Sequence, residues 1–310
     1  MKKIGWVFCP AFLAVCACGC QQFLATPHEL PISPERVRTL HVRAEPLYPP
    51  EDVHPVAFGH IRASDAEKNL VCVSTRDEKE RWFLNEYDIA HDRWTLKNRP
   101  VPVDSWSNFF LLPGRIYFTL AYTAQIWRFS FPSLSPIGEI QLENPCTEKY
   151  LLVDTAGEHI FCFVGGFGAA NLYRLSPDVK VEAHRSISVQ SGSSLAADAQ
   201  SVFYQTYMPP RRFRCDHNFV ACEEVKDIAL SRHCGAAACR NGWFFFDSYY
   251  HIYAYDASFR TEKDLGEVFH NGGVLSIGLT RDYIATISRD RKYLRVLDWD
   301  FSCVRTVPLP

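Results

Sequence analysis

The chain has 310 residues, and 33 basic and 35 acidic side chains give it a formal net charge of −2. Charges of both signs are mixed along the chain, so neither a basic stripe for nucleic acid nor an acidic tail is present. Aromatic residues make up 14% of the chain and there are only two methionines. This composition favours a rigid β core over a helical one.

The first 20 residues predict a secretory leader. Two lysines are followed by an apolar run of 12 residues, Ile4–Val15. That length suits the core of a signal peptide and is too short for a membrane span of about 20 residues. The following segment, Val15–Gln22, resembles the lipobox of bacterial lipoproteins, in which a cysteine after a small residue is lipidated. Cys18 fits this pattern slightly better than Cys20, and an ordinary, cysteine-rich signal peptide is the alternative.

Behind the leader, residues 21–37 are rich in proline and show little periodicity, which predicts a tether. Residues 38–310 then form one large domain, with no later run of transmembrane length. We therefore expect an extracytoplasmic, membrane-anchored lipoprotein, facing the outer membrane or the periplasm. Its contact with the membrane is expected through the N-terminal lipid only, and we expect a monomer.

A short phrase recurs six times in this domain, each copy ending in Asp or Ser. The copies are Trp82–Asp88, Gln125–Ser130, Asn171–Ser176, Arg211–Asp216, His251–Asp256 and Tyr293–Asp298, with spacings of 42, 46, 40, 40 and 42 between their last residues. A period near 40 with strand-like content is typical of a β-propeller. We interpret the apolar positions as a packing layer and the closing Asp or Ser as a turn former.

Each repeat divides into four predicted strands, bounded by Gly, Pro and Ser. The second repeat shows this most clearly, with strands at Ser107–Leu112, Arg115–Tyr122, Gln125–Phe131 and Ile137–Leu142. The other blades are predicted at Pro55–Asn98, Tyr150–Ser188, Ser193–Val225, Ala236–Lys263 and Gly273–Val307. The fold class is therefore all-β, a six-bladed β-propeller of four-stranded antiparallel blades. A many-stranded sandwich would not produce this constant period, and no sustained helical stripe is seen.

One strand-like segment, Arg38–Arg43, precedes the first blade. A closed ring must join its first and last blades, because open sheet edges invite aggregation. We expect this strand to close the ring by pairing with the final blade. The alternative is that it belongs to a degenerate seventh blade.

The lipobox-like leader, the tether and the six aromatic-rich blades together resemble the six-bladed, TolB-like propeller lipoproteins of bacteria. The resemblance covers essentially the whole chain as architecture, without a shared diagnostic motif. It implies a propeller of the cell envelope, and it implies no particular ligand or reaction. A WD repeat is disfavoured because the Trp-Asp dipeptide occurs in one blade only, at Trp299, and paired glycines of the kelch type are found only at Gly165 and Gly272.

The cysteines beyond the leader predict at most one disulfide from local spacing. Cys215 and Cys222 flank a hairpin turn, so they lie opposite each other if the turn is centred on Asn218–Phe219. His233, Cys234 and Cys239 resemble half of a metal site, but a structural zinc site needs four ligands and no second half is visible. No metal and no cofactor are expected.

Function on a propeller is usually carried by loops around the channel, here those between blades and those joining the second and third strands. From these loops we select one aromatic side chain and several hydrogen-bond donors as candidate binding residues: Trp106, Arg232, His233, His270, Asn271 and Arg289. Such a set could receive a sugar, a carboxylated ligand or a partner's loop. For any single one of them, a solvated loop residue or a strand cap is the interpretation that we favour.

No catalytic motif emerges from the sequence. A Gly-x-Ser-x-Gly elbow and a His-Glu-x-x-His helix are both missing, and no acidic pair can be selected from scattered carboxylates. The aromatic run Trp243–Phe246 is expected to pack between blades. We favour a non-catalytic binding or scaffold protein that takes a protein, peptide or glycan at the channel face. The alternative is a propeller lyase or hydrolase acting on a carbohydrate or lactone.

Overall fold

The computed structural model describes the part of the chain that begins at residue 55. The described residues are 55–103, 106–120, 123–143, 150–165, 168–188, 192–206, 211–225, 237–248, 251–256, 262–267, 277–288 and 292–310. They fall within one compact unit, Ser33–Pro310. The predicted leader, the tether and the strand Arg38–Arg43 lie outside them.

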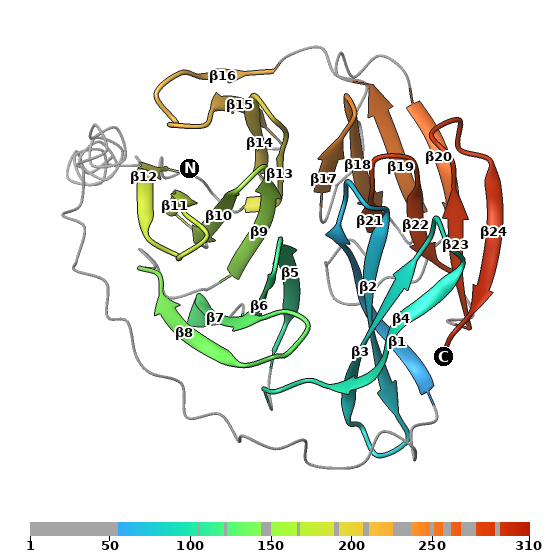
Figure 1. Ribbon diagram of the computed structural model, residues 1–310. Helices are drawn as coiled ribbons and strands as arrows, with labels where there is room; N and C mark the ends of the chain where they lie inside the picture. The colour runs from blue at the N-terminus through green and yellow to red at the C-terminus, as the bar shows by residue number, and fades with distance from the viewer. Residues whose placement is uncertain are drawn as a thin grey trace, which may run out of the picture. The chain divides into compact units, whose positions relative to one another are not determined.

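These residues form β-strands that pair, four consecutive strands at a time, into antiparallel sheets (Figure 1). Blade 1 contains β1 (Pro55–Asp65), β2 (Leu70–Asp77), β3 (Trp82–Asp88) and β4 (Arg93–Pro100). Blade 2 contains β5 (Asn108–Leu112), β6 (Arg115–Leu120), β7 (Gln125–Ser130) and β8 (Pro136–Gln141). Blade 3 contains β9 (Tyr150–Ala156), β10 (His159–Gly165), β11 (Ala170–Leu175) and β12 (Val181–Ile187).

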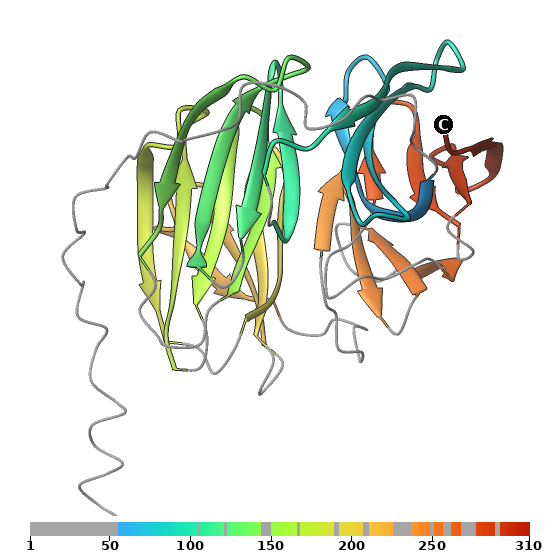
Figure 2. The same cartoon turned by 90° about the horizontal axis from the view of Figure 1, so that it is seen from below.

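The second half of the domain repeats this plan, with the strands of each blade side by side (Figure 2). Blade 4 contains β13 (Gly192–Ala197), β14 (Ser201–Thr206), β15 (Arg212–Asp216) and β16 (Cys222–Glu224). Blade 5 contains β17 (Ala237–Arg240), β18 (Trp243–Ser248), β19 (His251–Asp256) and β20 (Glu262–Glu267). Blade 6 contains β21 (Ile277–Leu279), β22 (Ile284–Ile287), β23 (Tyr293–Leu297) and β24 (Cys303–Pro308). The fold is the predicted six-bladed β-propeller, and blade 5 extends four residues beyond its predicted end, from Lys263 to Glu267.

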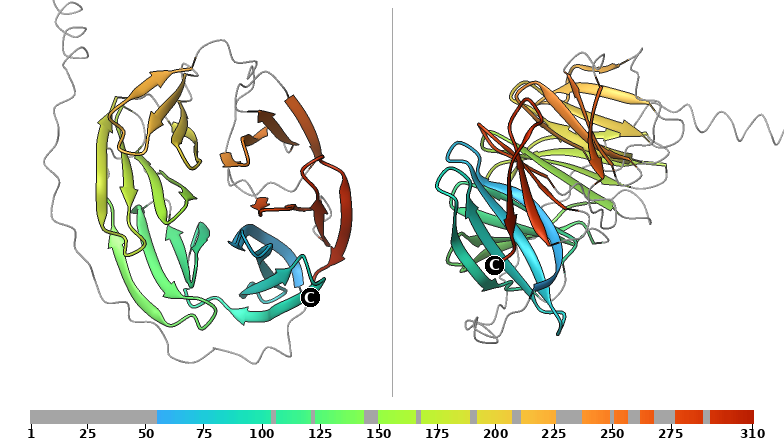
Figure 3. Two further views of the ribbon diagram at one scale, coloured as in Figure 1. Left: turned by 45° about the horizontal axis from the view of Figure 1, so that its top comes forward. Right: turned by 90° about the vertical axis from the view of Figure 1, so that its right-hand side faces the viewer.

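The blades form a closed ring through their innermost strands (Figure 3, left). Each innermost strand contacts that of the next blade, from β1 through β5, β9, β13 and β17 to β21, and β21 contacts β1. Six hydrophobic clusters lie between the sheets, one at each interface between neighbouring blades. The core is therefore a ring of six interfaces.

The burial of each strand follows from its place in the blade. The second strands, such as β10 and β14, are buried along almost their whole length because both of their faces pack against neighbouring blades. The outermost strands β4 and β24 alternate or are largely exposed. Phe244 and Phe246 pack toward blade 4, and Phe245 between them packs toward blade 6. This confirms that the run Trp243–Phe246 fills the interfaces.

The Asp or Ser that closes each sequence repeat forms the turn between the third and the outermost strand. Ser176 accepts the backbone N–H of Val179 on its carbonyl at 2.8 Å and that of Lys180 on Oγ at 3.2 Å. Asp298 does the same with Phe301 at 3.1 Å and, through Oδ1, with Ser302 at 2.9 Å. The predicted role as turn former is confirmed in these blades.

These turns also place an apolar residue at positive φ, where side chains other than glycine are uncommon. The residues are Leu134, Val179, Phe219 and Phe301, with φ values of 57°, 55°, 59° and 65°. The first three are buried and Phe301 is partly buried, each at the interface with a neighbouring blade. Burial of the side chain offsets the unfavourable backbone conformation. Each of these turns therefore packs one apolar side chain between two blades.

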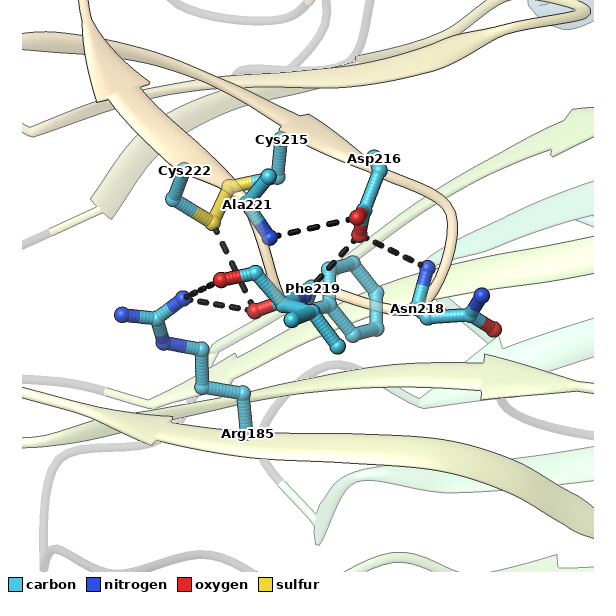
Figure 4. The surroundings of a disulfide bond; sticks show 8 residues. Arg185, Cys215, Asp216, Asn218, Phe219, Ala221 and Cys222 are labelled. Atoms are coloured by element: carbon cyan, nitrogen blue, oxygen red, sulfur yellow. Dashed lines mark hydrogen bonds between the residues drawn. A yellow bond between two sulfur atoms is a disulfide. The ribbon is translucent and has the colours of Figure 1, made fainter.

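In blade 4 this turn lies between Cys215 and Cys222, which form a disulfide (Figure 4). The two residues are directly paired in the β15–β16 ladder, which confirms the pairing expected from their spacing. Arg185 of β12 donates from Nη1 to the carbonyl oxygen of Phe219 at 2.6 Å. The hairpin of blade 4 is thereby tied to blade 3.

The ring closes where blade 6 meets blade 1. Both sheets take their four strands from their own stretch of chain, and the expected partner strand Arg38–Arg43 lies outside the described residues. The two sheets approach closely at Gly278 of β21, where an added Cβ would come within 2.9 Å of Val71 Cγ1. Among the described residues, this seam is held by side-chain packing of the cluster that includes Ile61 and Val71, and by hydrogen bonds between blades 1 and 6, such as those that join Asn69 and Asp282.

Candidate functional site

One of the predicted binding residues, Trp106, lies in the described part of the chain. It is partly buried at the interface of blades 1 and 2, with its ring 5.1 Å from Trp82 and 5.4 Å from His60 between centroids. In this place Trp106 packs between blades. The other predicted residues fall outside the described ranges, and they stay predictions: Arg232, His233, His270, Asn271 and Arg289.

A cavity of about 340 Å³ lies at one end of the channel, and we call it the channel pocket. It is formed by the ends of the innermost strands β1, β5, β9 and β17, by β21 and by the turns that lead into the second strands. That end is opposite to the one at which the sequence-based candidates were expected. Its lining is Arg62–Glu67, Phe110–Pro113, Val153–Thr155, Gly157, Ala238–Arg240, Ile277 and Leu279.

Arg62 of β1 brings a cation to the channel pocket. Its Nη1 donates to the carbonyl oxygen of Ile61 at 2.8 Å, and its Nη2 donates to Oδ1 of Asn108 on β5 at 3.4 Å. Burial lowers the pKa of Arg62 to about 10, and the negative charge of Asp154 opposes that shift. The guanidinium therefore keeps its charge at neutral pH.

Asp154 of β9 is the acidic group of the channel pocket. Its Oδ2 accepts the backbone N–H of Ala197 from blade 4 at 2.9 Å, and its Oδ1 accepts that of Thr155 at 2.9 Å. Burial raises the pKa of Asp154 to about 7, against the two N–H donors and the charge of Arg62, which lower it. The carboxyl is thus held between two blades and changes its charge near neutral pH.

Arg62 and Asp154 are surrounded by protein, yet each keeps part of its surface in contact with the channel space. This combination is expected for side chains that line a narrow channel. Their contact with that space offsets part of the cost of burying their charged forms. Both groups are accessible to a small molecule in the pocket.

The rim of the channel pocket carries two ion pairs. Arg240 of β17 binds Glu67 with 2.6 Å between Nη2 and Oε1, and Lys68 binds Asp65 with 2.8 Å between Nζ and Oδ2. Each pair balances its own charge. Cys239, next to Arg240 in the chain, also lines the pocket, and burial raises the pKa of its thiol, so the sulfur is not a thiolate at neutral pH.

His60 lies two residues before Arg62 and is buried in the aromatic cluster of Trp106. Its backbone N–H donates to Oγ of Ser74 at 2.8 Å, and its ring meets Phe109 edge to face with centroids 6.5 Å apart. Burial, followed by the positive charge of Arg62, lowers the pKa of His60 to about 3. The imidazole is therefore neutral at physiological pH and adds no charge to the site.

The channel pocket presents the guanidinium of Arg62 and the titrating carboxyl of Asp154. The apolar residues of β5 and β21 in its lining are buried, and their side chains belong to the clusters between blades. Within the described ranges, no group of three or more His, Cys, Asp or Glu side chains is placed to hold a metal ion. In the same part of the chain, no helix has the length and apolar character to cross a membrane.

Sequence reasoning missed Arg62 and Asp154, although both carry a signal. Asp154 is the one charged residue in the strand Tyr150–Ala156, and Arg62 stands directly between Ile61 and Ala63. In a propeller, the innermost strand is the place where such a residue reaches the channel. The residues predicted from the sequence belong to loops, whereas the pocket is lined largely by strand ends.

Comparisons with known proteins do not assign a family. No family model matches the chain, and no curated protein matches it. Among solved structures, the chain is similar to Kluyveromyces marxianus Hsv2 with a TM-score of 0.44 and 9% identity, covering 82% of this chain and 81% of that one. It is also similar to Kluyveromyces lactis Hsv2 with a TM-score of 0.45 and 10% identity, covering 78% of this chain and 73% of that one. We draw neither family nor function from these two similarities, and the resemblance to TolB-like lipoproteins stays a prediction.

Proposed function

We propose that the protein is a lipid-anchored, extracytoplasmic β-propeller that binds a ligand in the channel pocket and does not transform it. The observation that carries the binding role is the pocket itself, in which the lining residues Arg62 and Asp154 bring a guanidinium and a carboxyl to one cavity. Concave, largely apolar sites with a few placed polar groups are the usual form of a ligand site. The rigid ring of six blade interfaces holds these groups in place.

The chemistry of the lining supports binding over catalysis. Both oxygens of Asp154 accept backbone N–H groups, which fixes the carboxyl in position. The thiol of Cys239 is held in its protonated form, which is a poor nucleophile. The strongest functional group is then the guanidinium of Arg62, which orients and neutralises a ligand.

Binding is tested by screening a library of small molecules and short peptides by thermal shift against the purified protein. We expect ligands that stabilise the protein to lose their effect in Ala66→Trp, which adds bulk to the pocket lining. Ala90→Trp, at an exposed position in the β3–β4 turn, is the matched control and should keep every effect. If every stabilising ligand acts equally on Ala66→Trp, the pocket is not the binding site.

Anchoring is supported by the lipobox-like leader, and an oxidising compartment by the Cys215–Cys222 disulfide. The test is metabolic labelling with a fatty acid, followed by detergent phase partition of the full chain. We expect label and detergent partition in the parent protein, and loss of both in Cys18→Ala or Cys20→Ala, whichever carries the lipid. Unlabelled parent protein in the aqueous phase would leave an ordinary signal peptide as the explanation.

A second function is favoured by one observation, the pKa of Asp154 near 7. A carboxyl that titrates at working pH suits general acid–base chemistry, as in a lyase or hydrolase of carbohydrates or lactones. Turnover of polysaccharides or lactones that disappears in Asp154→Asn would establish this alternative. Turnover that persists unchanged in Asp154→Asn would remove Asp154 from it.

A further inference from the structure

We propose that two arginines between blades 2 and 3, Arg115 and Arg128, form a site for a tetrahedral oxyanion, that is, a phosphate or sulfate group. The two side chains share one carboxylate, that of Asp178. None of the three residues lines the channel pocket. The site therefore adds a second binding role, and this proposal stands or falls independently of the one made for the pocket.

The fold brings both guanidiniums to one carboxylate oxygen. Arg115 begins β6 and Arg128 lies on β7, and their Nη1 atoms are 3.1 Å and 2.8 Å from Oδ1 of Asp178, in the turn between β11 and β12. Nη1 of Arg128 also donates to the carbonyl oxygen of Pro177 at 3.3 Å, and the hydroxyl of Tyr117 donates to the same oxygen at 2.7 Å. The turn of blade 3 thus holds the two arginines of blade 2 next to each other.

The charge of this cluster favours an anion. Two cations share one carboxylate, which leaves one positive charge in excess. Two other carboxylates of these blades are engaged elsewhere. Glu139 of β8 accepts Nε1–H of Trp127 at 2.7 Å, and Glu182 of β12 lies 3.3 Å from Nε of Arg174. An anion that approaches Arg115 and Arg128 therefore enters a positive field.

The two arginines also have N–H groups left for a ligand. Both bonds of Arg128 come from Nη1, and its buried Nε has no hydrogen-bond partner. Arg115 is ion-paired with Asp178 and lies beside the hydroxyl of Tyr117, where burial raises the pKa and Arg115 opposes the shift. Each guanidinium offers five N–H donors in a planar fork. A tetrahedral oxyanion can accept from both forks at once, because its oxygens point in several directions.

The cluster is open to solvent on the side of Arg115. The side chains of Arg115 and Asp178 are 33% and 57% exposed, and that of Arg128 is 14% exposed. On the outer strand β8, Gly138 is directly paired with Arg128, and an added Cβ there would meet nothing within 4 Å. Directly paired residues carry their side chains on the same face of a sheet, so no side chain from this position covers Arg128. An anion can therefore reach Arg115 from solvent, and Asp178 is its competitor.

The test is a nuclear magnetic resonance titration of the ¹⁵N-labelled full chain with inorganic phosphate, sulfate and acetate. Sodium chloride keeps the ionic strength constant, because salt screens exposed charges. The Nε–H signals of Arg115 and Arg128 are assigned by their absence from Arg115→Gln and Arg128→Gln. We expect phosphate and sulfate to shift both signals at millimolar concentration, and acetate to bind about 3- to 10-fold more weakly.

Two substitutions should change the affinity in opposite directions. Arg115→Gln should weaken phosphate binding by about 3- to 10-fold, measured on the signal of Arg128. Asp178→Asn should strengthen it by a similar factor of about 3 to 10, because the competing carboxylate is gone. A purely structural ion-pair cluster would not bind an anion more tightly after this change.

Arg281→Gln on blade 6 is the matched control, because Arg281 is 58% exposed and is bound to one carboxylate, that of Asp282. It should leave phosphate binding unchanged. Far-ultraviolet circular dichroism identifies which variants are folded, and Asp178→Asn carries the comparison if Arg115→Gln is unfolded.

A second arm separates a soluble ligand from a lipid headgroup. Glucose 6-phosphate is titrated in the same way, and phosphatidylglycerol vesicles are tested by co-sedimentation, each with the parent protein and with Asp178→Asn. Stronger binding to Asp178→Asn in either assay supports the site and identifies its source.

Three results would overturn the proposal. They are the absence of any shift with phosphate and sulfate, acetate binding as tight as theirs, and parent affinity in both folded variants, Arg115→Gln and Asp178→Asn. None of these results bears on the channel pocket, which the screen with Ala66→Trp tests separately.

Discussion

Ionisable residues in the channel change their titration because of where the strands place them. Asp154 and His60 are shifted in opposite directions, the pKa of the first raised to about 7 and that of the second lowered to about 3, mainly by burial in both cases. Both shifts favour the neutral form. At mildly acidic pH, Asp154 is therefore largely neutral while Arg62 keeps its charge.

These opposite shifts predict how stability depends on pH. Asp154 binds its proton more tightly in the folded state than in the unfolded state, so its contribution is present below about pH 4 and is lost as pH rises through 7. His60 is the reverse: its contribution is present above about pH 6.5 and is lost as pH falls toward 3. Between about pH 4 and 6.5 the two slopes oppose each other, and the stability curve should be nearly level.

Asp154→Asn should remove the decrease in unfolding free energy that Asp154 causes as pH rises. The difference in unfolding free energy between the variant and the parent protein should grow by about 2 to 4 kcal/mol in favour of the variant as pH rises from 4.5 to 8, since the variant has no carboxylate to bury. Urea denaturation across this range measures the difference. Asp300→Asn, at an exposed position, is the control and should follow the parent curve. A parallel shift of the Asp154→Asn curve, with no change in slope, would contradict the prediction.

The recurring element of this molecule is the turn that closes each third strand. Asp298 accepts two backbone N–H groups on Oδ1, from Asp300 at 3.0 Å and from Ser302 at 2.9 Å, and so holds Phe301 against the neighbouring blade. The same geometry in blades 3 and 4 shows that the repeated Asp or Ser has a structural role.

Asp298→Ala should therefore destabilise the protein by about 1 to 3 kcal/mol. The substitution leaves two N–H groups without their acceptor and weakens the packing of Phe301 against the neighbouring blade. Asp300→Ala, in the same turn, removes a carboxylate that is exposed and should change stability by less than about 0.5 kcal/mol. Chemical denaturation of the two variants side by side checks this. Equal effects would show that charge, and not the turn, is what matters there.

The hairpin of blade 4 adds a covalent link to the same element. The Cys215–Cys222 disulfide closes a loop with a sequence separation of 7, for which loop entropy predicts a contribution of about 2 to 3 kcal/mol. The double variant Cys215→Ala with Cys222→Ala should lose this amount in urea denaturation. Because Arg185 still binds the turn through Phe219, we expect the variant to stay folded.

At the scale of the whole molecule, the ring is held together by six interfaces. Five of them join blades that follow one another in the chain, and the seam joins the last blade, blade 6, to the first, blade 1. Gly278 lies at this seam, 2.9 Å from Val71 when a Cβ is added. Valine is stiff at its branched carbon and cannot turn aside easily. The approach of the two sheets therefore depends on the missing side chain.

Gly278→Ala should destabilise the protein by about 1 to 3 kcal/mol through overpacking at the seam. Gly138→Ala is the matched control, because the added Cβ would meet nothing within 4 Å on the outer strand β8. It should be neutral or stabilising by up to about 1 kcal/mol. Melting temperatures of the two variants measure the difference. A neutral Gly278→Ala would mean that the seam is loose enough to accept a methyl group.

The sequence predicted the ring and its turns because both repeat. A period near 40 and a closing Asp or Ser at each copy are local signals, and strand packing between Trp243 and Phe246 follows from alternation. The channel pocket could not be predicted in the same way. Arg62 and Asp154 are 92 residues apart, and they act on each other only because ring closure brings β1 and β9 to one channel.

Every blade of this ring takes four strands that follow one another in the chain, and among the described strands no sheet is shared between distant segments. A gene of this kind can lengthen or shorten by whole blades, since copying or deleting one stretch adds or removes a complete sheet with both of its packing faces. The inner strand of each copy would bring its own channel residue. The number of blades and the chemistry of the channel can thus evolve together, one duplication at a time.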